Sequence, residues 1–536
     1  MSGIEPVGRG ERRVRVAVKA ARVRKTLSVC PVCLMRVEAS VVRRGDDYYM
    51  EKRCGEHGAF STVVWRGRDP SFEDWGDYVP PLDGYVPDCP TGCGLCPGHR
   101  QKTCCALVEV TSRCNLRCPV CYAASGVGGD VGDGGTARAD SLQDSSEVPA
   151  IIGLAPFLET GARDADCDPD VDSLRLIFKR LADGGNTFVQ ISGGEPTVRG
   201  DLPEIIAAAR ESGCDTVQLN TNGIRLGTDP EYARVLRNAG LSFVFMQFDG
   251  TDDEICRRLR GKPLFDAKCA AIRACGESNL GVTLVPTIVP GVNDHNIGDI
   301  IRFAIKHSPD VRGVHFQPVS YFGRYEGKPS NEARITLPEV LRAIVSQTDG
   351  KFKISDFTPS ACDHPRCGFH GDFVVLPKNA IMRIKQNAPC CSAAPPSVGA
   401  LRATPSTPLS VGSLRATPST PPHIKSRNFV ARRWTRPAPD DAPATDDTLT
   451  PNDTSALDDT PSPAPTQQPT TDIDAFLRRV KNNGFTITAM AFQDAYNLDI
   501  ERLRLCSLHV AEGAGLIPFC ARYITNVGCG AQVVSD

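Results

Sequence analysis

Three cysteines lie close together in one stretch of the chain, at a spacing that suits a metal-binding loop. They are Cys114, Cys118 and Cys121 in the run TSRCNLRCPVCYA, spaced CxxxCxxC. This spacing brings three thiolates onto one tight loop, enough to bind three irons of a 4Fe–4S cluster. Ferredoxin-type clusters use four cysteines, so the fourth iron would be open to a small molecule. The alternative is a zinc loop, or coincidence in a chain with 23 cysteines.

A second motif follows the cysteine loop along the chain, at Gly193, Gly194, Glu195 and Pro196. It comes directly after Phe188 to Ile191, a short apolar run rich in β-formers that predicts a buried strand. Glycines at the end of a strand permit close backbone approach to a ligand. The carboxylate of Glu195 can accept hydrogen bonds from a cationic amine. On its own, the motif would be an ordinary strand-to-helix turn.

The bulk properties of the chain exclude several classes of protein. It has 536 residues and a formal net charge of −2, so its overall charge does not favour nucleic acid as a partner. The cysteines come in CxxC and CxxxCxxC groups, which is metal spacing and favours a reducing, cytoplasmic compartment. There is no apolar run of the ~18 residues that a transmembrane helix needs, and the N-terminus lacks the apolar core of a signal peptide.

Residues 1–27 form a predicted basic arm. The stretch from Arg12 to Lys25 is rich in basic residues and contains no acidic residue. Two interpretations stay open: a solvated arm, or peripheral contact with an anionic membrane surface.

Residues 28–70 predict a small metal-stapled module of the rubredoxin or zinc-ribbon type. Cys30 and Cys33 form a CxxC knuckle, and Cys54 and His57 form a second pair after two short strands. Four such ligands on two turns suit one Zn or Fe ion, with His57 the weakest member of the set. The hydrophobic core of such a small β module is too small for the module to fold without a bound metal ion.

Residues 85–105 repeat the CxxxCxxC spacing. Cys89, Cys93 and Cys96 supply three thiolates, and Cys104 or Cys105 supplies the fourth. A full cysteine set predicts an auxiliary 4Fe–4S cluster for electron transfer or structure. Zinc is the alternative metal.

Residues 106–335 alternate strands with helices, which predicts a parallel α/β sheet. The expected strands are 106–110, 187–192, 215–219, 242–248, 282–288 and 313–318, and the expected helices include 202–212, 230–239 and 265–275. Barrel-like α/β folds carry their chemistry at the carboxyl ends of the strands. Asn220, Asn222, Gln247, Asp249 and Gln317 lie at such ends, where each is either a ligand contact or a polar cap.

Two segments interrupt this pattern. Residues 125–170 are rich in Gly and Asp and predict an inserted loop. Residues 392–470 are dominated by Pro, Thr, Ser, Ala and Asp, and the run SVGALRATPSTP at 397–408 recurs as SVGSLRATPSTP at 410–421. Such a composition cannot bury a core, so a disordered linker is expected.

The regions on either side of this linker, 336–391 and 471–536, hold further cysteines. Cys362 and Cys367 lie before it, and Cys506 and Cys520 lie after it. If the linker loops out, these four thiolates can meet and bind a third cluster. The alternative is two unrelated structural pairs.

The order of these motifs resembles the archaeal radical S-adenosylmethionine (SAM) family that includes tetraether lipid synthase and pterin methylases of methanopterin biosynthesis. The motifs are CPVC with C-x-EHG, then TSRCNLRCPVCYA, GGEPTVR, HFQPVSYFGR and finally IPFC. The chain departs from the pattern at Cys506-Ser507, where such enzymes are expected to carry a Cys-Cys pair.

The resemblance implies a partial (β/α)6 barrel with SAM bound at the cluster on Cys114, Cys118 and Cys121. It further implies that the GGEP stretch holds the SAM amino group, and that reduction of SAM yields a 5′-deoxyadenosyl radical. A one-electron donor such as ferredoxin or flavodoxin is implied as a partner.

Within that family, the main interpretation is carbon–carbon coupling of phytanyl chain termini in archaeal-type lipids. The first alternative is a radical SAM methyltransferase acting on a methanopterin precursor. An alternative of another class is a zinc-scaffolded interaction protein, which the missing basic face and the GGEP motif disfavour.

Overall fold

The computed structural model describes residues 21–76, 89–90, 95–125, 168–325, 329–384, 420–437, 472–513 and 515–524. Most of the predicted arm, most of the predicted insert, the repeats up to residue 419 and Cys93 lie outside these residues. None of the described helices combines the length and the apolar character needed to cross a bilayer.

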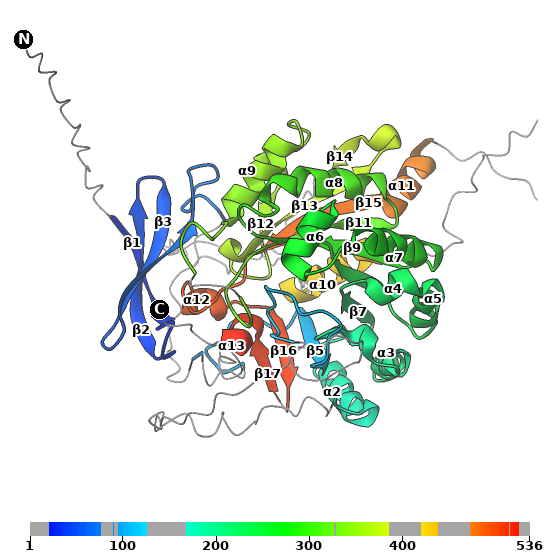
Figure 1. Ribbon diagram of the computed structural model, residues 1–536, viewed down its shortest axis with the longest axis horizontal. Helices are drawn as coiled ribbons and strands as arrows, with labels where there is room; N and C mark the ends of the chain where they lie inside the picture. Colours follow the sequence, from blue (N-terminus) through cyan, green and yellow to red (C-terminus); the bar gives the residue numbers. More distant parts are fainter. Residues whose placement is uncertain are drawn as a thin grey trace, which may run out of the picture.

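The N-terminal module is a separate antiparallel sheet, seen at the left of the molecule in Figure 1. Its four strands follow chain order: β1 (Ala21–Val29), β2 (Arg36–Arg44), β3 (Asp47–Cys54) and β4 (Gly58–Trp65). Residues 21–27 therefore belong to a strand, and assigning them to the basic arm was wrong. They pair with β2 through backbone hydrogen bonds, which a count of basic side chains cannot reveal.

The main body is built on a large sheet in which six neighbouring strands run parallel, as the sequence predicts. These strands are β5 (Cys105–Thr111), β6 (Phe188–Gly193), β7 (Thr216–Thr221), β8 (Phe243–Gln247), β9 (Gly281–Val285) and β11 (Val311–Pro318). The two-residue strand β10 (Thr287–Ile288) also pairs with β11.

Helices connect these strands and cover the outer face of the sheet (Figure 1). They are α2 (Val171–Asp183), α3 (Leu202–Glu211), α4 (Ile224–Thr228), α5 (Pro230–Asn238), α6 (Asp253–Arg260), α7 (Phe265–Glu277), α8 (Ile297–Lys306) and α9 (Leu337–Gln347). Helix α6 shows strong local signals. The side chain of Asp252 accepts from the backbone N–H of Ile255 at its start, and Gly261 ends it in the left-handed conformation.

The C-terminal region completes the sheet at both edges. Strand β15 (Gly484–Met490) pairs parallel with β11, and β13 (Gly368–Val375) pairs antiparallel with β15, followed by the short strands β12 (Thr358–Pro359) and β14 (Ile381–Arg383). At the opposite edge, β16 (Leu508–Glu512) pairs parallel with β5 and antiparallel with β17 (Gly515–Pro518). Three short helices complete this region: α11 (Asp472–Asn482), α12 (Ile500–Leu503) and α13 (Phe519–Ile524).

Helix α10 (Pro422–Trp434) lies inside the segment that the sequence predicts as disordered. That prediction was wrong for residues 420–437, because Trp434, Arg427 and Arg433 are all buried against the barrel. The run HIKSRNFVARRW differs in composition from the Pro- and Thr-rich sequence on either side of it. The average composition of residues 392–470 therefore gives no indication of this helix.

A buried ion pair fixes the C-terminal region to the loop that follows β11. The guanidinium of Arg334 donates to both carboxylate oxygens of Asp494, at 2.7 and 3.1 Å. Asp494 is 0% exposed and also accepts from the backbone N–H groups of Tyr321 and Tyr496. The carboxylate is therefore fully engaged by donors from three chain segments.

Replacing Arg334 by Ala leaves the Asp494 carboxylate buried without its cation. We expect the free energy of unfolding to fall by about 3–5 kcal/mol, measured by chemical denaturation. The matched control is Lys179→Ala, which removes the exposed Lys179–Asp183 pair (2.6 Å) on α2. The control should cost no more than about 0.5 kcal/mol. Equal losses in the two variants would contradict a structural role for the buried pair.

Candidate functional site

The cysteine loop follows β5 and opens into a cavity of about 380 Å³ inside the barrel, here called the barrel cavity. Cys114, Cys118 and Cys121 all line it, as the sequence predicts for a loop that presents three thiols to one ligand. Burial raises the pKa of the Cys114 thiol to about 12. A bound metal must therefore displace its proton, because only the thiolate binds metal well.

Two arginines, Arg324 and Arg260, hold the backbone of this loop. Arg324 donates from Nε to the carbonyl of Cys118 at 2.7 Å and from Nη2 to the carbonyl of Ser125 at 2.9 Å. Its own backbone pairs with Cys121 in a two-way bridge of 2.8 and 2.9 Å. Arg260, the last residue of α6, donates to the carbonyl of Val120 at 3.2 Å. The loop carbonyls are thus bound to the protein while the thiols remain free to face the cavity.

Gly193 and Gly194 make room for the cysteine loop itself. A Cβ on Gly193 would lie 2.2 Å from the carbonyl oxygen of Thr111, and one on Gly194 would lie 2.1 Å from that of Arg113. The backbone N–H groups of Gly194 and Glu195 donate to these same two carbonyls at 2.8 Å. The close approach that the sequence predicts at these glycines is therefore made to the base of the cysteine loop.

The Glu195 carboxylate joins the ends of β6 and β7. It accepts from the backbone N–H and hydroxyl of Thr197, the hydroxyl of Thr221 and the backbone N–H of Asn222, at 2.6–3.1 Å. Burial raises its pKa, against the lowering effect of these four donors. Glu195 lines the barrel cavity, but the protein itself provides these donors. Pro196 begins the 3-10 turn that Glu195 caps.

Asp249 and Gln247, both predicted as cofactor contacts, differ in position. Asp249 is 0% exposed and receives two hydrogen bonds from Arg260, at 2.7 and 2.8 Å. It therefore positions an arginine that holds the cysteine loop. Gln247 lines the cavity and donates to Asp249, and its carbonyl groups accept from the buried ammonium of Lys268. Burial lowers the pKa of Lys268 to about 8.

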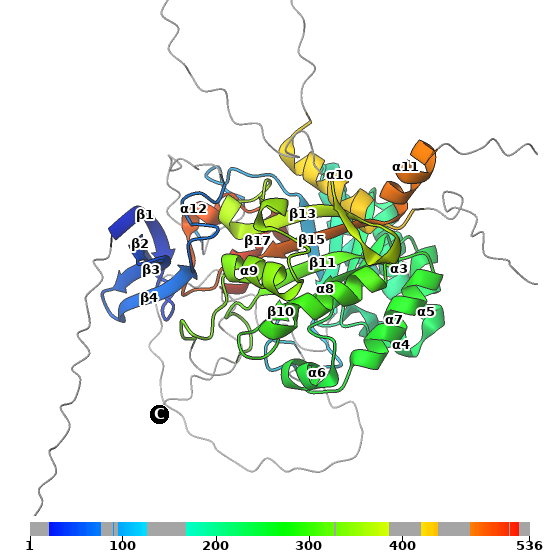
Figure 2. The ribbon, with the colours of Figure 1, turned by 90° about the horizontal axis from the view of Figure 1, so that it is seen from above.

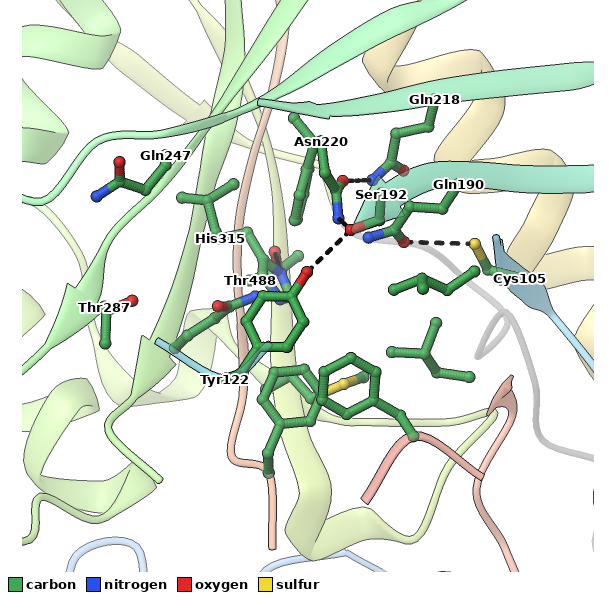
Figure 3. Close-up of a pocket in the computed structure, with 18 of the residues that line it drawn as sticks. Cys105, Tyr122, Gln190, Ser192, Gln218, Asn220, Gln247, Thr287, His315 and Thr488 are labelled. Carbon is green, nitrogen blue, oxygen red and sulfur yellow. Dashed lines mark hydrogen bonds between the residues drawn. The ribbon is translucent and has the colours of Figure 1, made fainter. Parts of the chain in front are cut away.

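A belt of polar side chains crosses the inner wall of the barrel cavity, here called the polar belt: Gln190 and Ser192 on β6, and Gln218 and Asn220 on β7 (Figure 3). Gln218 donates to the Asn220 side-chain oxygen at 2.9 Å, and Asn220 donates to Ser192 at 3.3 Å. The Tyr122 hydroxyl, one residue beyond the cysteine loop, lies 2.8 Å from the Ser192 hydroxyl. The belt thus reaches the cysteine loop.

Of this belt, only Asn220 was predicted from the sequence, as a residue at the end of a strand. The signal that identifies the others is a polar residue at every second position of a predicted buried strand, as in FVQISG and TVQLN. Successive side chains of a strand point to opposite faces. Gln190 and Ser192 therefore face the barrel interior while Val189 and Ile191 pack under the helices.

Aromatic side chains lie beside the polar belt, since Phe245 on β8 pairs in register with Asn220 on β7. Phe245, Trp434 and His315 all line the cavity, and the ring centroids of Phe245 and Trp434 are 5.4 Å apart. His315 Nδ1 lies 2.8 Å from the Thr488 hydroxyl, and burial lowers its pKa to about 4. The imidazole is therefore neutral at pH 7 and serves as a hydrogen-bonding group.

The N-terminal sheet gathers its four predicted ligands. One ligand atom each of Cys30, Cys33, Cys54 and His57 lies within 4.8 Å of the others, a donor set that fits one tetrahedral ion. The pKa of the Cys54 thiol is lowered to about 6 by hydrogen bonds from His57 and nearby backbone N–H groups. The site lies in a different sheet from the barrel cavity.

The structure brings together cysteines from two of the predicted groups. Cys104, expected to bind a cluster with Cys89, Cys93 and Cys96, lies within hydrogen-bonding reach of Cys362, and Cys93 lies outside the described residues, so that predicted set stays a prediction. Its backbone N–H donates to Ser507, which brings the start of β5 against the C-terminal segment. The other three expected partners of Cys362, namely Cys367, Cys506 and Cys520, lie close enough to influence one another's pKa. Sequence spacing could not foresee the contact between Cys104 and Cys362, because it depends on the pairing of β16 with β5.

Comparisons with known proteins agree with this architecture. Residues 108–304 match the Radical SAM superfamily, and residues 22–66 match the HMPTM N-terminal zinc ribbon domain. The 7,8-dihydro-6-hydroxymethylpterin dimethyltransferase of Methanocaldococcus jannaschii is 36% identical over 342 residues, which is 63% of this chain and 61% of that protein. The Fe-coproporphyrin III synthase of Methanosarcina barkeri is 31% identical over 238 residues, covering 44% of this chain and 48% of that protein. The chain thus spans less than two thirds of each relative.

Gly194→Ala tests whether the backbone contact under the cysteine loop is essential. The added methyl group would meet the carbonyl of Arg113 at 2.1 Å, so the loop must move. We expect the anaerobically reconstituted variant to lose roughly four irons per chain, the content of one cluster, and to keep its ribbon metal. The control is Gly200→Ala, where a Cβ meets nothing within 4 Å. Full iron content in Gly194→Ala would refute the contact's importance.

Proposed function

We propose, for a chain that contains a radical SAM domain and an N-terminal zinc ribbon domain, that the protein transfers a methyl group to a small pterin-like heterocycle. The observation that carries the proposal is the polar belt on the inner wall of the barrel cavity. This was the alternative in the sequence analysis, and it has better support than coupling of lipid chains.

The residues present fit the cofactors of a radical SAM domain. Cys114, Cys118 and Cys121 offer three soft thiolate ligands on one wall of the cavity and would hold a 4Fe–4S cluster with one open iron. When bound, the cluster and SAM supply a carbon-centred radical that makes unactivated C–H bonds reactive. The protein's part is to hold the substrate beside the loop and to exclude water and side reactants. A one-electron donor such as ferredoxin or flavodoxin belongs to the proposal.

The polar belt suits a heterocycle with alternating hydrogen-bond donors and acceptors. A primary amide offers both an acceptor oxygen and two donor hydrogens. The Gln218, Asn220 and Ser192 side chains are already joined in one chain of hydrogen bonds, which fixes their orientation. A site built to hydrogen-bond its substrate rejects analogues that lack the polar groups, because its buried groups are then left unpaired.

The size of the cavity and its aromatic lining residues agree with a small planar substrate. A volume of about 380 Å³ falls in the range of roughly 300–1,000 Å³ that small-molecule sites occupy. Phe245 and Trp434 provide apolar faces in the cavity lining, against which an aromatic ring can pack. The 36% identity to a dihydropterin dimethyltransferase supports the same substrate class.

A second candidate, coupling of phytanyl chain termini, is favoured by an apolar part of the cavity lining. Phe322, Phe492 and Phe519 line the cavity, and the rings of Phe492 and Phe519 stack at 4.4 Å. An alkyl chain would pack well there. An alkyl chain cannot hydrogen-bond with the amides of the polar belt, however, so they would keep only the partners they have in one another, whereas a polar heterocycle adds hydrogen bonds.

One anaerobic experiment separates the two candidates. Reconstituted protein, reductant and SAM are incubated with 7,8-dihydro-6-hydroxymethylpterin in one tube and with archaeol lipid in another, and the products are identified by mass spectrometry. We expect a pterin heavier by a methyl group, together with 5′-deoxyadenosine. A lipid product lighter by hydrogens and without an added methyl group would establish chain coupling instead and overturn the proposal.

Asn220→Leu tests the polar belt directly. It removes an amide of similar size from the middle of the hydrogen-bonded chain, so Gln218 and Ser192 each lose a partner. We expect pterin affinity to fall by roughly 10–100-fold, from an unpaired-group cost of about 1–3 kcal/mol, while substrate-independent SAM cleavage persists. The control is Asn238→Leu, an exposed residue at the end of α5. Unchanged pterin affinity in Asn220→Leu would show that the belt does not contact the substrate.

A further inference from the structure

Helix α10 covers the end of the barrel opposite the cysteine loop. In Figure 2 it lies across the barrel beside α11, while the cysteine loop follows the carboxyl end of β5. We infer that α10 is a fixed wall that sets the depth of the barrel cavity and so limits the size of the substrate. This inference rests on the proposed function only in taking the barrel cavity as the substrate site.

The first half of α10 is held by one arginine at the amino ends of β5 and β6. Arg427 donates to the carbonyls of Thr103 at 3.1 Å, Cys104 at 3.3 Å and Gly185 at 2.8 Å, and to the hydroxyl of Thr187 at 3.1 Å. These groups come directly before the two strands, which begin at Cys105 and Phe188. The arginine therefore ties α10 to both strands at once.

The second half is held by a charge pair and by the main chain. Arg433 pairs with Asp372 at 2.5 Å, and Arg312 donates to the carbonyl of Arg433 at 2.9 Å. The indole N–H of Trp434 donates to the hydroxyl of Thr486 at 3.0 Å. The contacts of α10 thus reach β11, β13 and β15 as well as β5 and β6. Because α10 is bound to residues in or directly before five strands, it forms a part of the barrel.

The strands in turn are shaped to receive α10. A Cβ on Gly281, the first residue of β9, would lie only 2.2 Å from the carbonyl oxygen of Trp434. A Cβ on Gly484, the first residue of β15, would lie 2.6 Å from Nη1 of Arg433. At Gly281 the clash would be with a backbone atom, which cannot move away by rotation about a side-chain bond. Docking of α10 therefore requires glycine at this strand start.

One face of α10 forms the inner surface of the wall. Ser426, Phe429, Val430 and Trp434 line the barrel cavity, at the spacing that places residues on one side of a helix. The Trp434 ring lies 5.6 Å from that of Phe243 and 5.4 Å from that of Phe245. It is 8% exposed and fills the barrel axis at this end. A substrate that enters beside the cysteines therefore meets a ring held by packing and a hydrogen bond.

The chemical consequence is a length limit. A compact heterocycle fits between the cysteine loop and Trp434, whereas a longer molecule would collide with the indole ring. Removing that ring should deepen the cavity without touching the polar belt or the cysteine loop. The wall is thus a specificity element for substrates that extend toward α10.

Binding of n-alkanols of increasing length tests this wall without any assumption about the natural substrate. The full-length protein is titrated with hexanol to hexadecanol by calorimetry. Each buried methylene should raise affinity about fourfold, until the chain reaches the wall and the gain stops. We expect this cut-off to move to longer chains in Trp434→Ala and Phe429→Ala. Gly281→Ala should move it too, because it displaces α10 from outside the cavity.

Two matched controls accompany these variants. Leu176→Ala truncates a large side chain that is 72% exposed on α2, and Gly200→Ala adds a methyl group where nothing lies within 4 Å. Both should keep the wild-type cut-off, and circular dichroism checks that every variant is folded. The same cut-off in wild type and in all folded wall variants, or alkanol binding by none of them, would overturn the inference. A shifted cut-off in a protein that does not methylate pterin would sustain the wall and reject the proposed function.

Discussion

The contact between Gly193-Gly194 and the base of the cysteine loop is the constraint on which the site depends. Two backbone hydrogen bonds of 2.8 Å join these segments, at a separation that leaves no room for a Cβ on either glycine. The contact sets the loop at the carboxyl end of β5 and β6. Arg260 and Arg324 also bind carbonyls of the loop. With its backbone held by these contacts, the loop presents its three cysteines to the barrel cavity.

The cavity in turn is closed by segments that are distant in sequence. The cysteine loop forms one end, and α10 forms the other, more than three hundred residues later along the chain. Between these two ends, the polar belt comes from β6 and β7, and apolar lining residues such as Phe492 and Phe519 come from the C-terminal region. The site is therefore assembled from three parts: the parallel core, a helix within a low-complexity segment, and the C-terminal strands that pair with both edges of the core.

Much of the fold could be predicted from local pattern. The six parallel strands and the helices at 202–211, 230–238 and 265–277 follow from hydrophobic periodicity and turn residues, and the radical SAM domain is confirmed by the match over residues 108–304. The four ligands of the N-terminal site also follow from spacing, because a knuckle and a hairpin turn are short-range features. The polar belt could have been predicted in the same way, because its polar residues occupy every second position of a strand.

The sequence by itself determined the candidate residues for the chemistry: the three thiols of one loop, the glycines beside it, and the four residues that gather in the ribbon. Within the loop, the glycine motif and each pair of ribbon residues, the members lie within a few positions of one another, so their spacing can be recognised directly in the amino-acid sequence. Only the tertiary structure decided that Cys104 meets Cys362, that Glu195 is engaged by four protein donors, and that α10 closes the barrel. These arrangements depend on strand pairing and helix docking between distant segments. Such contacts are selected by packing and by the pairing of buried polar groups, which no local pattern records.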